Sequence, residues 1–245
     1  MLSTCHFNFE AVDSSWLPCL KEALSKIDSN YLEKLCQTDH WLPGSEKIFN
    51  AFSLPVKQVN YVLFGESPYP RAKSANGFAF WDAAVKDIWS TTGLSKEVNR
   101  ATSLRNIIKM LLVAEGLLQP DQTSQQHIAQ LDKHLLVQTN QEFFNNFLRQ
   151  GFLLLNATPV LQPNQVKKDA LIWQPFIKHV LNYLLQKNPD ITLILFGQIA
   201  NTIDSLLDLS QVKKLYAEHP YNISFINNTK VIGFFRPLHL LLRGG

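Results

Sequence analysis

The chain has 245 residues, of which 46% are hydrophobic and 18% are charged, and its formal net charge at pH 7 is +3. This composition can bury a large core and excludes long disordered segments. The mildly basic balance permits a nucleic-acid partner without requiring one. Because no window reaches the apolar length of a membrane span and no secretory signal stands at the N-terminus, we expect a protein without membrane contact.

The first 40 residues predict a helical segment, because their apolar side chains recur at helical spacing. Three short apolar runs predict buried strands and a weaker run predicts a fourth, at residues 61–64, 152–155, 192–196 and 214–217. Helical patterns separate them, at residues 103–115, 141–149, 173–186 and 199–207. Because strands alternate with helices, we predict one α/β domain over residues 1–245, a three-layer α/β/α sandwich with a central, mainly parallel four-stranded sheet.

Polar residues stand where three of the predicted strands end. Gly65 and Glu66 follow the first strand, Asn156 closes the second along the chain, and His219 follows the last. Ligands of such sheets bind at the carboxyl ends of the strands. A random scatter of polar residues would seldom fall on all three ends, so we predict a binding or active site at this edge.

Residues 62–80 carry the most informative pattern. An apolar run ends at Gly65, the stiff turn SPYP follows at residues 67–70, and two phenylalanines, Phe78 and Phe80, come next. A strand, a tight turn and an aromatic ring present backbone N–H groups and a stacking surface to a ligand. The pattern therefore predicts a site for a planar molecule.

This pattern resembles the uracil-DNA glycosylases. Their first motif, GQDPYH followed by GLxFS, is matched by GESPYP and GFAFW, their LLLN by the strand that ends at Asn156, and their HPSPLS by HPYNIS at residues 219–224. Weaker matches follow in the same order, so the resemblance covers residues 15–242. It implies a DNA-repair enzyme that turns a base out of DNA and cleaves its N-glycosidic bond.

The resemblance also implies roles on the base. Asn156 reads the uracil edge, since one amide donates to O4 and accepts from N3–H. Tyr69 excludes the methyl group of thymine, Phe80 stacks on the base, and His219 stabilises the negative charge of the departing uracil. Outside the family, Asn156 would be read as a turn cap, His219 as a helix cap and the aromatic residues as core, and these alternatives stay open.

DNA contacts follow from the same resemblance. Ile223 matches the leucine that enters the duplex where the base has left. Ser103 and Ser224 match serines that contact phosphates, and Pro43, in the loop at residues 41–45, is counted with them. The expected partner is therefore DNA, single- or double-stranded.

Several positions depart from the family pattern. Ser67 stands where the family has its catalytic aspartate, and a neutral hydroxyl can place water but cannot offset the positive charge of an oxocarbenium-like transition state. Glu66 is our hypothesis for a substitute acid, with Asp82 as the alternative. Gln198 and Tyr221 occupy two other serine positions, which predicts weaker or altered duplex binding.

The cysteines are Cys5, Cys19 and Cys36, an odd number without zinc spacing. They indicate a reducing, intracellular setting, either cytoplasm, nucleoid or nucleus. Some members of the superfamily hold an iron–sulfur cluster with four cysteines, so we expect no cluster here. No phosphate-cradling glycine motif, nucleophile elbow or paired metal-ligand motif is present, so we expect no metal and no cofactor.

Three functional hypotheses follow. The first is a monomeric, monofunctional uracil-DNA glycosylase that excises uracil or a related damaged pyrimidine, with Ser67, Glu66 and His219 in catalysis. The second is a weak or inactive relative that binds DNA, a free base or a protein. The third is an unrelated small-molecule enzyme on a doubly wound sheet.

Overall fold

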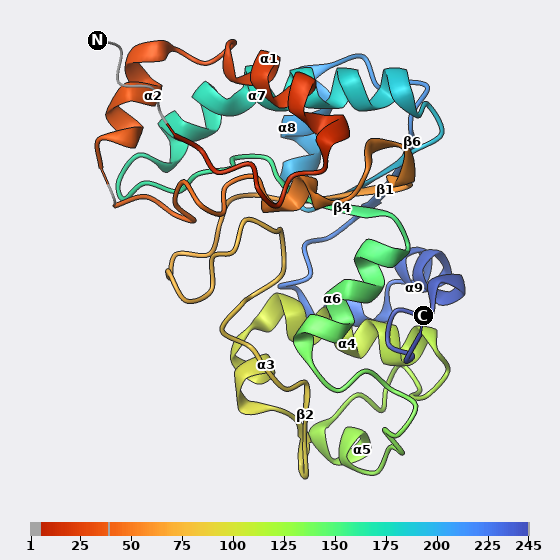
Figure 1. Ribbon diagram of the computed structural model, residues 1–245. Helices are drawn as coiled ribbons and strands as arrows, with labels where there is room; N and C mark the ends of the chain where they lie inside the picture. The colour runs from red at the N-terminus through yellow and green to blue at the C-terminus, as the bar shows by residue number, and fades with distance from the viewer. Residues whose placement is uncertain (1–5, 39, 245) are drawn as a thin grey trace. The chain divides into compact units, whose positions relative to one another are not determined.

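The computed structural model describes residues 6–38 and 40–244, which form two compact units (Figure 1). The first unit contains the residues up to Ala79 together with Gly151–Ile194 and Ile199–Lys214. The second contains Phe80–Gln150, Leu195–Gln198 and the chain from Leu215 onward. The chain passes several times from one unit to the other, so neither unit is one continuous segment.

The sheet consists of four strands in the order β4-β1-β5-β6, with bounds β1 Tyr61–Gly65, β4 Phe152–Asn156, β5 Thr192–Phe196 and β6 Lys213–Ala217. β1 and β4 are parallel, with Gly65 opposite Asn156. All residues of β4 are buried, as expected for a strand covered on both faces. The prediction of an α/β class with a four-stranded sheet is confirmed, and each strand end lies within one residue of its expected position.

The first unit carries four α-helices in its described residues, α1 Leu17–Leu24, α2 Ser29–Cys36, α7 Val166–Lys187 and α8 Ile199–Leu206. α1 packs against α7, and Figure 1 shows the two helices running side by side. α7 begins at Val166, before the predicted residue 173, and therefore contains Pro175. The proline leaves the carbonyl of Leu171 without its helical donor, and that residue is exposed to water, so the helix tolerates the loss.

The second unit holds α3 Lys96–Arg100, α4 Thr102–Ala114, α5 Gln125–Ala129, α6 Asn140–Arg149, α9 Thr229–Phe235 and a hairpin of β2 Trp89–Ser90 with β3 Gly93–Leu94. α4 packs against α9 and against the 3₁₀ helix η4, Ile223–Asn227. α6 begins with a capping box, in which Thr139 and Glu142 satisfy each other's backbone N–H groups. These contacts give α4 a central place within this unit.

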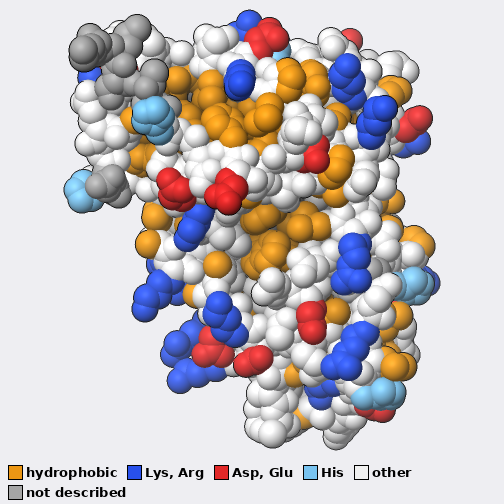
Figure 2. Space-filling model, viewed as in Figure 1, with side chains coloured by type: hydrophobic (Ala, Val, Ile, Leu, Met, Phe, Trp, Pro, Cys, Tyr) orange, Lys and Arg blue, Asp and Glu red, His pale blue; other side chains and the backbone are white. Residues whose placement is uncertain are grey.

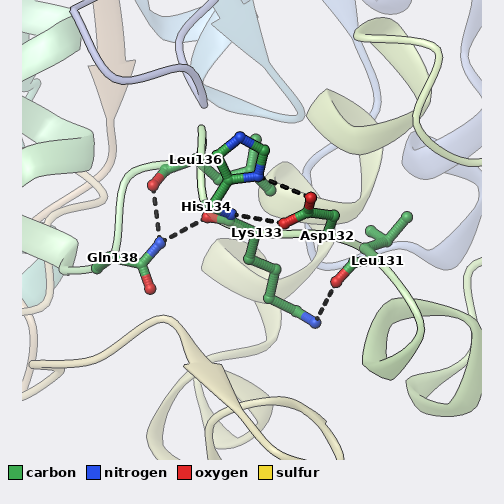
Figure 3. Close-up of polar contacts among 6 residues, drawn as sticks. All are labelled: Leu131, Asp132, Lys133, His134, Leu136 and Gln138. Atoms are coloured by element: carbon green, nitrogen blue, oxygen red, sulfur yellow. Dashed lines mark hydrogen bonds and ion pairs between the residues drawn. The ribbon is translucent and has the colours of Figure 1, made fainter.

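Local polar contacts fix the turn that leads into α6 (Figure 3). The Asp132 carboxylate accepts from the backbone N–H of His134 at 3.0 Å, and its second oxygen lies 2.7 Å from His134 Nδ1. The Gln138 amide donates to the carbonyls of Lys133 and Leu136, both at 2.8 Å. Both members of the His134–Asp132 pair are exposed, so this pair organises a surface turn rather than a reaction centre.

The cysteines of the described residues differ in state. Cys19 is buried and free, and burial, with the charge of Glu22, raises the pKa of its thiol to about 12. Cys36 is disulfide-bonded, which is uncommon in a reducing compartment. Cys5 lies outside the described residues. Within the described chain, no helix combines the length and the apolar character that crossing a membrane requires.

Candidate active site

The first part of the candidate site lies where β1 and β4 end side by side in the first unit. The segments that follow β1 and β4 remain hydrogen-bonded to each other beyond the strand ends. Ala157 N–H donates to the Gly65 carbonyl and Thr158 N–H donates to the Glu66 carbonyl, both at 2.9 Å. Ala79 N–H donates to the Leu154 carbonyl at 3.0 Å, so the loop that leaves β1 returns to the same edge. The loop at residues 65–79 is thus anchored at both ends beside Asn156.

Asn156 presents an amide in a buried place. Its exposed fraction is 4%, and no described residue forms a hydrogen bond with its side chain. A Cβ added to Gly65 would lie 2.5 Å from Asn156 Oδ1 and 2.9 Å from Ala79 Cβ, so only glycine leaves room for this arrangement. Buried amides are nearly always hydrogen-bonded, so this donor and acceptor are available to a ligand.

The turn after β1 holds the predicted catalytic pair of the first unit. Glu66 is exposed, Ser67 and Tyr69 are partly buried, and Pro68 between them is buried. The buried proline fixes the backbone on both sides, which places the Ser67 hydroxyl and the Tyr69 ring at the end of β1. Glu66 contributes its carbonyl to the pairing with Thr158, while its carboxylate faces water.

Asp82, the alternative acid, lies in the second unit in a different setting. Its exposed fraction is 1%, and its Oδ1 accepts from the backbone N–H of Ala84 at 2.9 Å. The amide of Asn140 donates to its carbonyl at 2.9 Å. These bonds give Asp82 a structural role in the turn that follows Phe80.

Phe80 opens the second unit with an unusual backbone. Its φ angle is 62°, in the left-handed region that bulky residues avoid. Its ring and that of His219 have centroids 6.1 Å apart with planes inclined at 33°. A strained bulky residue is often retained at a functional site, so the structure brings two predicted site residues together around a backbone constraint.

His219 lies in the turn that follows β6. Gly197 N–H, at the exit of β5, donates to the Ala217 carbonyl at 2.9 Å, and a Cβ at Gly197 would lie 2.9 Å from His219 Cβ. His219 Nδ1 accepts from the backbone N–H of Tyr221 at 3.1 Å. Because Nδ1 is an acceptor, the neutral ring carries its proton on Nε2, and that N–H can stabilise a developing anion.

Asn106 holds the same turn and was not predicted as a site residue. It is fully buried in α4, and its Nδ2 donates to the Pro220 carbonyl at 2.7 Å and lies 3.4 Å from the carbonyls of Tyr221 and Asn222. Arg105 Nε donates to its Oδ1 at 3.1 Å, which fixes the orientation of the amide. The sequence signal was a polar residue on the apolar face of a helix, which needs a partner when buried.

The acid before His219 supports the other side of the turn. The Glu218 carboxylate accepts from Asn228 Nδ2 at 2.7 Å. Burial raises the pKa of Glu218, but hydrogen bonds from its own backbone N–H, from Asn228 and from Ser224 outweigh burial and lower it. A charged Glu218 therefore ties Ser224 and η4 to the end of β6.

The predicted DNA contacts fall into two groups. In the second unit, Ile223 is 69% exposed, Ser224 is exposed, and Ser103 lies in the first turn of α4, the helix that packs on η4. In the first unit, Pro43 is buried and follows a cis peptide bond. Ile223 and Ser224 are therefore exposed enough to contact DNA, whereas Pro43 is buried and offers little surface for such a contact.

Helix α4, whose Asn106 binds the turn at Pro220, also carries positively charged side chains. Arg105 and Lys109 lie one helical turn apart, and neither forms an ion pair with a described residue. Burial, and then the charge of Arg105, lowers the pKa of Lys109. On the face in Figure 2, Lys and Arg side chains are interspersed with Asp and Glu. Arg105 and Lys109 thus carry positive charge, without an ion-pair partner among the described residues, on the helix that packs against η4, and such charge attracts phosphates.

Comparisons with known proteins agree with the resemblance. No protein-family model matches the chain. The uracil-DNA glycosylase of Streptococcus gordonii is 27% identical over 86% of this chain and 85% of its own length, and that of Streptococcus agalactiae is 29% identical over 86% and 85%. These matches span most of the chain and most of each relative.

Solved structures show a nearer likeness. The crystal structure of the UNG from Nitratifractor salsuginis has a TM-score of 0.90 and 43% identity, covering 95% of this chain and 94% of its own. Mimivirus uracil-DNA glycosylase has a TM-score of 0.60 at 18% identity, which shows the fold alone. The predicted three-layer α/β/α sandwich is confirmed by the first likeness.

Proposed function

Because the chain belongs to the uracil-DNA glycosylase superfamily, we propose that it removes uracil, or a related damaged pyrimidine, from DNA by hydrolysing the N-glycosidic bond. The observation that carries the proposal is the buried amide of Asn156, which has no hydrogen-bond partner among the described residues. Its N–H donates to O4 of uracil and its oxygen accepts from N3–H, whereas cytosine has the opposite pattern on this edge.

Three further residues act on the base. Tyr69, restrained by the buried Pro68, stands against C5 and excludes a methyl group. Phe80 stacks on the ring, an interaction that contributes about 1–3 kcal/mol. His219 donates its Nε2–H to O2 as negative charge develops on the leaving uracil. One such donor lowers the activation free energy by about 2.7–4 kcal/mol. The hydrogen bond from Tyr221 to Nδ1 supports this tautomer.

The sugar side of the reaction depends on Ser67 and Glu66. The Ser67 hydroxyl holds the attacking water, and the Glu66 carboxylate accepts its proton and offsets the charge on the sugar. Positioned general bases contribute about 10²–10⁴-fold to a rate. The support for Glu66 is its place next to Ser67 at the end of β1, while Asp82 is engaged with a backbone N–H.

The test is an alkali-cleavage assay on a labelled uracil oligonucleotide, both single- and double-stranded. Wild-type protein should give strand cleavage that Asn156→Ala abolishes, and Glu66→Gln should lose about 10²–10⁴-fold if Glu66 is the base. Glu10→Gln, an exposed glutamate of the first unit, is the matched control and should retain full activity. Failure of wild-type protein to release any damaged base would overturn the proposal.

The second candidate function is DNA or base binding without efficient cleavage. The neutral Ser67 and the exposed carboxylate of Glu66 favour it, since neither is an acid held in place by hydrogen bonds. Tight binding of uracil-containing DNA without abasic product would support it, and cleavage gained in Ser67→Asp would show a pocket that lacks only its catalytic charge. Robust wild-type turnover would remove it.

The remaining features of the proposal concern state and place. We take the protein to act as a monomer, with residues 1–245 as one functional domain, inside the cell where its DNA substrate lies. Neither a metal nor another cofactor enters the proposed chemistry. Light scattering after size exclusion should give a mass near 27.9 kDa, and a dimer would contradict this.

A further inference from the structure

The turn between β6 and η4 exposes two large apolar side chains. Tyr221 and Ile223 are each 69% exposed, which makes them the most exposed large hydrophobic residues in the described part of the chain. They are separated by one residue and flank Asn222. Ile223 already has a proposed role as the wedge that replaces an extruded base, but no role described above uses the ring of Tyr221.

The backbone beneath the Tyr221 ring is fixed from several sides. Its N–H donates to His219 Nδ1 at 3.1 Å, and its carbonyl lies 3.4 Å from Asn106 Nδ2. Asn222 N–H donates to the His219 carbonyl at 2.9 Å. Pro220, which precedes Tyr221, is buried. A tyrosine has only two side-chain torsions, so a ring on such a backbone loses little conformational entropy when it binds.

The positive charge of α4 indicates which kind of partner the Tyr221 ring would contact. Arg105 contacts Asn106, which holds the turn, and Lys109 follows one helical turn later without an acidic partner among the described residues. An exposed ring on a turn held by α4, the helix that carries these two cations, matches single-stranded nucleic acid, in which bases stack on aromatic side chains while cations attract phosphates. A protein partner would not require the cations, and paired bases in a duplex would not offer a free face.

We propose that Tyr221 is a stacking platform for an unpaired nucleobase next to the extruded one, and that it shifts the preference of the protein toward single-stranded or locally opened DNA. This inference rests on the proposed function, because it assigns the neighbouring base of the same substrate. Where the family has a short serine that contacts phosphate, this chain offers a ring that contacts a base. The contact exchanges a hydrogen bond to phosphate for stacking.

The test measures binding rather than cleavage, so that it does not depend on base release. Fluorescence anisotropy would follow a labelled, uracil-free oligothymidine, the same strand with abasic residues, and the matching duplex. Tyr221→Ala should weaken binding to the oligothymidine by about 5- to 150-fold and should leave binding to the abasic strand within about twofold. Tyr221→Phe, which keeps the ring, should stay within about twofold of wild type on every probe.

Each other outcome has a definite meaning. An equal loss on the abasic strand would show a phosphate contact, an equal loss in Tyr221→Phe would show that the hydroxyl acts, and an equal loss on duplex would remove the strand preference. Any of these overturns the proposal. Because the ring is exposed, Tyr221→Ala should have the same melting temperature as wild type, and a thermal unfolding scan checks this. Ring-dependent binding without base release would sustain this inference while overturning the proposed function.

Discussion

Two strand exits position Asn156 and His219, the groups that we propose to act on the base, and they do so in different ways. At the end of β1, Gly65 leaves room for the amide of Asn156, which is 4% exposed and belongs to the sheet itself. At the end of β5, Gly197 leaves room for His219, which lies in a partly exposed turn held by side-chain hydrogen bonds. Glycine permits close approach in both places, but one group is fixed by the backbone ladder and the other by Asn106.

The largest expected effect comes from Gly65→Ala. The added Cβ would lie 2.5 Å from Asn156 Oδ1 and 2.9 Å from Ala79 Cβ, so the amide or the loop at Ala79 has to move. Displacement of a recognition group by about 1 Å costs about 10²-fold in rate, so base release should fall by at least that factor. The measurement is the single-turnover rate on uracil DNA.

Gly233→Ala is the matched control for this change. No atom lies within 4 Å of a Cβ at that position, so the variant should release base at the wild-type rate. If Gly65→Ala also keeps the wild-type rate, the amide of Asn156 is not held by close packing, and the proposed contrast between the two exits fails.

A smaller effect is expected from Gly197→Ala at the second exit. Its φ of +72° strains any side chain, and the new Cβ would lie 2.9 Å from His219 Cβ. The left-handed conformation costs about 1–2 kcal/mol for an L-residue, and movement of the turn to relieve it should lower the rate about tenfold. Urea unfolding and single-turnover rates together check this, and a loss as large as that of Gly65→Ala would show that the turn is as rigid as the sheet.

Asn106→Ala should separate the turn from its support. Loss of the amide leaves the Pro220 carbonyl without this donor, so the free energy of unfolding should fall by about 1–3 kcal/mol. Base release should fall less than tenfold, because Gly197 and the Tyr221–His219 bond remain. Denaturant titration and the same kinetic assay measure the two effects.

Asn146→Ala offers a closely matched control within the same unit. Asn146 is also fully buried in a helix, its Nδ2 donates to the carbonyls of Leu240 and Leu242 at 2.9 and 2.8 Å, and Arg149 donates to its Oδ1 at 2.7 Å. It should lose similar stability without a change in rate at saturating substrate. Equal kinetic losses in both variants would mean that Asn106 acts only through stability.

The smallest effect is a pH dependence at Glu218. Its folded pKa is lowered from the ordinary 4.5, so it contributes stability above that value and loses this contribution as the pH falls through the lowered folded pKa. Glu218→Gln should therefore be less stable than wild type near neutral pH, and the difference should shrink in acid. Denaturant midpoints across the acid range measure it, with the exposed Glu97→Gln as control. A difference that stays constant with pH would contradict this account.

The fold was largely predictable because its main elements are long and periodic. The four strands and helices α4, α6 and α8 lie within a residue or two of their expected positions, since buried runs and amphipathic helices leave clear patterns. The beginning of α7 was missed because Pro175 normally marks a helix start. Helices α3, α5 and α9 and the small hairpin were missed because elements of a few residues carry no period.

The candidate site was predictable only where a motif named its residues. Asn156 and His219 stand at the expected strand exits, but the role of Asn106 depends on carbonyls more than a hundred positions along the chain. Likewise, no local pattern shows that Gly197 faces His219. Such contacts between distant segments arise from packing, and a single sequence does not encode them in any short window. The roles of Ser67 and Glu66 stay predictions until the assay.

The left-handed backbone of Phe80 has a consequence for attempts to engineer this protein. Glycine would adopt φ 62° without the steric cost of about 1–2 kcal/mol that a phenylalanine carries. A screen that selects for heat resistance alone should therefore enrich glycine at this position and remove the ring proposed to stack on the base. Thermostable variants chosen in that way would trade repair capacity for durability, so selection on both properties is needed to keep the aromatic residue.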